Sequence, residues 1–180
     1  SAYHLQRTQI DLHQPGSAAR MGAALLAADA TLDQQIALSH TAADTYSAVE
    51  SLLLASGKAH AVLNAHTLIA PGADNANVRQ RLCAIPTSGQ PRVVLRPHME
   101  IHHDQVQAAH GATYGALPDE ALFYARQRGL DETSARALII EGMATALLER
   151  CFDDPETLAT LMADGLLART IAQQLEAHHG

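Results

Sequence analysis

The sequence predicts a mainly β protein that ends in a helical segment. Up to the seam at residues 110–113, apolar residues alternate in short runs that stop at proline or glycine, which is the pattern of strands and turns. From Pro118 onward, apolar residues recur at helical spacing almost without a break. We therefore divide the chain into a β core over residues 1–117 and a helical part over residues 118–180.

The β core is predicted as a series of short strands. The clearest runs are residues 5–12, 32–38, 60–63, 67–69, 92–95 and 99–101. No clear helix of the length found in βαβ units separates these runs, which favours an all-β part. The alanine-rich segments 23–30 and 42–55 have high helix propensity, but we assign them as strands because propensity alone is a weak guide. No exact repeat is present, although a coiled sheet needs only alternation and turns.

Capping residues mark the predicted helices. Gly129 ends a first helix that begins near Pro118, and Asp131 is a good N-cap for a second helix over residues 132–152. This second helix is apolar on more than one face, which predicts burial against its own domain and against a partner. A third helix begins at residues 154–156 with proline in its first turn, and Gly165 interrupts it before residues 166–175.

Composition narrows the classes of function. The 180-residue chain has a formal net charge of −7 and a single lysine, so it lacks the clustered positive surface of a nucleic-acid-binding protein. No apolar run is long enough to cross a membrane, and the first residues do not read as a signal peptide. Cys83 and Cys151 lie far apart in segments of different type, which favours two free thiols in a reduced, cytoplasmic protein.

Three motifs around the seam carry a family resemblance. They are Met99-Glu100-Ile101, then His110-Gly111-Ala112-Thr113-x-Gly115, then Leu122-Phe123-Tyr124-x-Arg126-x-Arg128-Gly129. Together they resemble the C-terminal half of the SufB/SufD family, the scaffolds of SUF iron–sulfur cluster assembly. His40, Ser47 and the segment 86–101 also fall where that family has core strands. The resemblance is closer to the SufD side, where the sequence HGAT is typical.

The resemblance implies a fold and a set of partners. The family core is a right-handed parallel β-helix, expected here over about residues 3–115, and it is followed by a helical subdomain that docks a SufC-like ABC ATPase. A SufB-like paralogue pairs through the β-helix, and a transient cluster forms at that interface without a stably bound cofactor. Family members are longer, so we expect this chain to be a C-terminal fragment. Its bare strand edges near residues 92–110 should then produce a homodimer in isolation.

His110 is the candidate site residue. It matches the family histidine implicated in cluster assembly, and the resemblance therefore implies a non-enzymatic scaffold in which His110 is an interface group and an iron ligand. Strand alternation places Ala108 on the same face, where many SufD-like chains have cysteine, so a partner would have to supply a thiolate. The competing interpretation is a histidine packed at a strand end and bonded to the backbone.

A second class of function is a histidine-ligated metalloenzyme on a β-helix, using His98, His102 or His110. Such a site needs converging ligands, and the adjacent His102 and His103 would point to opposite faces of a strand. We therefore assign no joint role to His98, His102 and His103.

Two further possibilities have little support. Cys83 and Cys151 are too few for a conventional cluster, which needs about four thiolate-type ligands, and both are expected to be packing residues. A carbohydrate-active β-helix would need paired carboxylates facing one groove, and Glu100 and Asp104 are too isolated for that chemistry.

Overall fold

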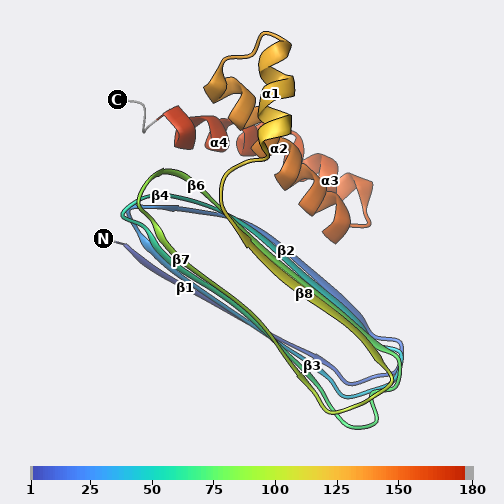
Figure 1. The fold of residues 1–180 in the computed structure, drawn as a ribbon. Coiled ribbons are helices and arrows are strands. Elements are labelled where there is room, and N and C mark those ends of the chain that lie inside the picture. The colour runs from blue at the N-terminus through green and yellow to red at the C-terminus, as the bar shows by residue number, and fades with distance from the viewer. Residues whose placement is uncertain (1, 177–180) are drawn as a thin grey trace.

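The computed structural model describes residues 2–176 and consists of two facing β-sheets with a group of helices at one end (Figure 1). The strands are β1 (Tyr3–Leu12), β2 (Ala18–Ala28), β3 (Thr31–His40), β4 (Tyr46–Gly57), β5 (His60–Ile69), β6 (Ala76–Gly89), β7 (Arg92–Ile101) and β8 (Val106–Tyr114). The odd sheet has the order β1-β3-β5-β7 and the even sheet has the order β2-β4-β6-β8. Every pairing is parallel, so the chain winds through both sheets as a four-turn β-helix. The predicted mainly β fold with a parallel β-helix is confirmed.

Successive turns are stacked in register but have unequal lengths. In the odd sheet, Tyr3 pairs with Thr31, Thr31 with His60 and His60 with Arg92, so the spacing between equivalent positions grows from turn to turn. The even sheet contains a further irregularity between Ala55 and Ser56. A variable turn length explains why no exact repeat is visible in the sequence.

The strands are longer than the sequence predicted. β5 and β7 each run unbroken through a point where two short runs were expected, and β7 passes through Pro97. The N–H groups of Arg92 and His102 donate to Ala59 and Ile69, so the even-numbered residues of β7 face β5. The nitrogen of Pro97 therefore faces the open edge, where it interrupts no hydrogen bond.

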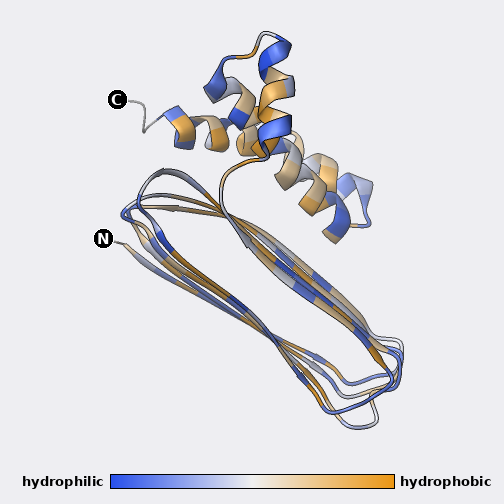
Figure 2. Ribbon diagram, in the orientation of Figure 1, coloured by the Kyte–Doolittle hydropathy of each residue, from blue (hydrophilic) through white to orange (hydrophobic). Residues whose placement is uncertain are grey.

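The alanine-rich segments are strands, as predicted, with different ends. Residues 23–28 of the first segment lie in β2, and the second is β4, which begins at Tyr46 after a turn over residues 42–45. Strand pairing on both sides outweighs the helix propensity of alanine in β4. Figure 2 shows hydrophobic and hydrophilic residues alternating along the strands.

The interior of the β-helix mixes apolar and polar side chains. Its apolar core includes the fully buried residues Ile36, Leu53, Ala61, Leu63 and Leu82. The buried His40 ring lies 2.8 Å from both Thr45 Oγ1 and Ser47 Oγ, and burial lowers the pKa of His40. These contacts satisfy a polar group that would otherwise destabilise the core.

Within residues 2–176 the helices all follow Pro118, as predicted. They are α1 (Asp119–Gln127), α2 (Glu132–Cys151), α3 (Pro155–Met162) and α4 (Leu166–Glu176). Asp131 caps α2 by accepting a hydrogen bond from Ser134 N–H, and Asp154 caps α3. The outer side of the even sheet packs against α2 and α4 through a cluster that includes Leu52 and Ile140. Within residues 2–176, no helix is long and apolar enough to cross a membrane.

Gly22 on β2 allows α2 to approach the even sheet closely. A Cβ atom at this position would lie 2.6 Å from Cys151 Sγ and 3.0 Å from Leu147 Cδ2. We expect Gly22→Ala to lower the free energy of unfolding by about 1–3 kcal/mol, because the added methyl overpacks this contact. Gly111→Ala is the matched strand control, since a Cβ there meets nothing within 4 Å. Equal chemical denaturation midpoints for both variants would contradict a tight contact at Gly22.

Candidate functional site

His110 lies on β8, the last strand of the even sheet. Its in-register neighbour on β6 is Gln80, which is buried on the inner face together with Leu82. In-register residues of parallel strands share a face, so the His110 side chain lies on the inner side of the β-helix. β8 pairs only with β6 among the described strands, and the ring is therefore exposed at the open end.

The peptide groups of His110 itself are also unpaired among the described strands. Gly115 N–H donates to Ala84 and Asn75 N–H donates to Gln105, so the odd-numbered peptide groups of this region face β6. Peptide groups alternate in direction along a strand, and those of the even-numbered His110 and Ala112 consequently face the open edge. An exposed imidazole thus lies beside a row of unpaired hydrogen-bonding groups.

Gln80 adds a buried acceptor next to His110. Its Nε2 donates to Thr67 Oγ1 at 2.8 Å and to the His98 carbonyl at 3.2 Å. Its Oε1 is buried and lacks a hydrogen-bond partner within the described part of the chain. The sequence analysis missed Gln80, because nothing but the register places it beside His110.

The His110 side chain makes no hydrogen bond or ion pair with any residue between 2 and 176 in this structure. In this structure it therefore lacks the backbone hydrogen bond of the competing interpretation. Ala108 shares its face, as strand alternation predicted. The role of His110 in cluster assembly and as an iron ligand stays a prediction.

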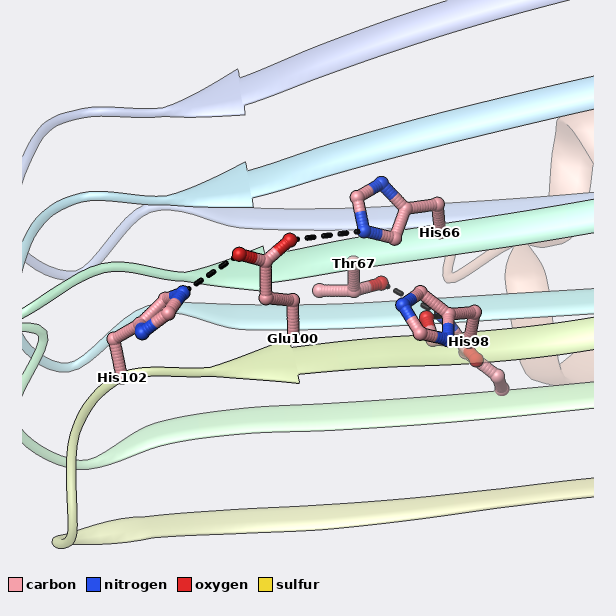
Figure 3. Close-up of polar contacts among 6 residues, drawn as sticks. His66, Thr67, His98, Glu100 and His102 are labelled. Atoms are coloured by element: carbon pink, nitrogen blue, oxygen red, sulfur yellow. Dashed lines mark hydrogen bonds and ion pairs between the residues drawn. The ribbon is translucent and has the colours of Figure 1, made fainter.

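His98 lies in a different place from His110. It is on the outer face of the odd sheet, where its ring stacks on His66 with centroids 5.0 Å apart (Figure 3). Glu100, on the same face, lies 2.7 Å from His102 Nε2 and 3.6 Å from His66 Nε2. The hydrogen bond with His102 is the main cause that lowers the pKa of Glu100.

His103 has partners of its own. It contacts the Asp74 carboxylate and accepts a hydrogen bond from Gly72 N–H at 3.3 Å, whereas His102 contacts Glu100. The two adjacent histidines thus take separate partners, but both lie in the loop after β7 and not on a strand, as the sequence analysis had assumed. In the described portion of the chain, no group of three or more His, Cys, Asp or Glu side chains is arranged to hold a metal ion. The structure therefore does not bring the predicted histidines into one metalloenzyme site.

The two cysteines are free thiols that lie between the even sheet and α2. Burial raises the pKa of both Cys83 and Cys151, which disfavours the thiolate form that binds metals. Cys83 is in register with Thr113, three residues along the strands from the Gln80–His110 pair. Because side chains alternate along a strand, an odd separation places Cys83 on the opposite face of the sheet from His110.

Comparison of the sequence with known proteins places the chain in a family. Residues 1–143 match the model of the SufBD core domain, described as SUF system FeS cluster assembly. An iron–sulfur cluster assembly SufBD family protein of Synechocystis sp. is 33% identical over 92 residues, which are 51% of this chain and 20% of that protein. The iron–sulfur cluster assembly protein SufD of Escherichia coli is 40% identical over 62 residues, which are 34% and 15% of the two chains.

A Mycobacterium leprae SufBD family protein is 35% identical over 96 residues, which are 51% of this chain and 24% of the relative. The matched segments thus span about a quarter or less of each of these relatives. The model match nevertheless covers the whole β-helix, α1 and the first half of α2. The chain belongs to the SufBD family of the SUF iron–sulfur cluster assembly system.

Proposed function

We propose that the chain acts as a non-enzymatic scaffold that pairs with a SufB-like paralogue at the open end of its β-helix. The observation that carries this proposal is the position of His110, whose exposed imidazole has no partner among residues 2–176 and lies beside the edge of β8 that no described strand pairs. A partner strand added to β8 would lie directly next to this ring. Reconstitution of cluster assembly with the paralogue and an ATPase, comparing wild type with His110→Ala, tests the proposal.

The nascent cluster is the cargo of this site. His110 would contribute one nitrogen ligand, and the partner would supply thiolate, because Ala108 offers none and Cys83 faces the other way. The Oε1 atom of Gln80 is suited to accept a hydrogen bond from the other ring nitrogen of His110. Such a contact would fix the tautomer and orientation of the imidazole.

The helices are the proposed docking surface for a SufC-like ABC ATPase. Large apolar side chains are exposed on them, and those of α1, α2 and α4 are Phe123, Tyr124, Leu138 and Leu166. Arg150, an exposed cation on α2, is a poor probe of docking. Its guanidinium forms a two-pronged ion pair with Glu50, at 2.9 Å and 2.7 Å, and so anchors α2 to β4.

We expect Phe123→Glu to weaken ATPase binding at least about tenfold. The complex would then bury a charge in the place where the wild type buries an aromatic anchor. Phe123 is 64% exposed in the isolated chain, so its replacement should leave the fold intact. Leu5→Glu is the matched control, since it introduces the same charge at an exposed apolar residue of β1. Titration calorimetry with the purified ATPase measures both, and equal affinities would move the docking surface away from α1.

A further inference from the structure

A pocket lies where the β-helix meets the helices. Its volume is about 320 Å³, and it is lined by the end of β6, by the segment that leads from β8 to α1, and by α1 and α2. The lining residues are Pro86, Thr87, Ser88, Gly89, Ala116, Leu117, Leu122 and Arg136. A volume of this size falls within the range of small-molecule sites.

Two polar groups in the lining lack acceptors. The Ser88 hydroxyl and the Arg136 Nε atom are both buried and have no hydrogen-bond partner in the described structure. Arg136 Nη2 makes only a long contact of 3.4 Å with the Thr87 carbonyl. Unpaired buried donors are costly, and both of these belong to residues that line one pocket, which favours an occupant that carries acceptors.

The pocket is also cationic. No carboxylate is among its lining residues, and Arg136 forms no ion pair with the acidic residues of the described chain, including Glu132 one turn earlier on α2. A guanidinium presents its Nε and Nη donors as a planar fork that matches two oxygens of an oxyanion. The Ser88 hydroxyl is a further donor in the same lining, and a phosphoryl group has enough oxygens to accept from the fork and from this hydroxyl together.

We propose that this pocket binds a phosphoryl oxyanion through Arg136 and Ser88. Leu117, Leu122 and Pro86 line the same pocket, so the oxyanion can be free phosphate or the head of a small phosphate ester. An occupant would contact β6 and α2 together, beside the link formed by Ala116 and Leu117. Binding would therefore tie the β-helix to the helices at the segment that connects them.

The test is binding of inorganic phosphate and of glycerol phosphate to the full-length protein, measured by titration calorimetry at constant ionic strength with chloride as the reference anion. We expect saturable binding of at least one of the two phosphates and none of chloride. Arg136→Gln should weaken that binding roughly ten- to a hundredfold, and Ser88→Ala should weaken it to a smaller extent. Binding of inorganic phosphate alone would identify free phosphate as the occupant, and preference for the ester would identify the organic form.

Arg126→Gln is the matched control, because Arg126 is an exposed arginine on α1 that is absent from the lining. If Arg136→Gln fails to fold, two other variants decide the question. They are Arg136→Lys, which keeps the charge but loses the fork, and Ser88→Ala. Phosphate affinity no greater than that for chloride would overturn the proposal. Unchanged affinity in the folded Arg136 and Ser88 variants would overturn it equally, since any phosphate would then be bound elsewhere.

Discussion

Replacing His110 by alanine in the full-length protein should lower the yield of assembled cluster at least about tenfold, with little change in melting temperature. Removal of groups that orient metal ligands typically costs ten- to a hundredfold in metal affinity, and loss of a ligand itself should cost no less. The side chain is exposed and makes no hydrogen bond or ion pair with the described residues. Surface substitutions of this kind usually change stability by within about 0.5 kcal/mol.

The matched control for this experiment is His60→Ala. His60 is likewise an exposed strand histidine without a side-chain partner in the described structure, but it lies at the start of β5 in the other sheet. Iron and sulfide content after reconstitution, together with a melting curve, separates the possible roles. Normal cluster content in the His110 variant would remove the site assignment. A loss of melting temperature that parallels the loss of cluster would instead identify His110 as a packing residue.

The alternation of the sequence predicted strands because the two faces of each sheet differ in burial, whereas the β-helix was implied by the family resemblance. The alternation in β3 and β5 follows directly from inner residues that are buried and outer residues that are half exposed. The prediction of two separate runs around Pro97 was wrong, because a proline inside a pattern of alternation usually indicates the end of a strand. Periodicity carries no information about whether a strand lies at an edge, and only the pairing pattern shows that the nitrogen of Pro97 faces outward.

The candidate site was predicted in part. His110 was found through a local motif, whereas its neighbour Gln80 lies on β6, a full turn of the β-helix earlier in the chain. The same holds for His66, which stacks on His98 from the preceding turn. Because the turns differ in length, no fixed period in the sequence pairs such residues. A search for histidines at equivalent positions in successive strands could have found the His66–His98 pair.

The open edge of β8 offers the second test with a large expected effect. Ala112 is even-numbered, so its N–H group faces away from β6 and is available to a partner strand. Ala112→Pro should abolish pairing with the SufB-like paralogue and also the self-association expected of the isolated chain, because it removes a donor from the edge and places a ring there. The bonds between β6 and β8 should survive, and the preceding Gly111 best tolerates the restriction that proline imposes.

Ala112→Val is the matched control, since it adds a side chain of comparable size on the inner face but retains the N–H group. Light scattering of the isolated chain and a pull-down with the paralogue measure the two kinds of pairing. A proline variant that still pairs as wild type would show that the partner does not add a strand to β8. In that case His110 would lose its neighbour across the interface, because the proposed position of the cluster depends on a second chain reaching this edge.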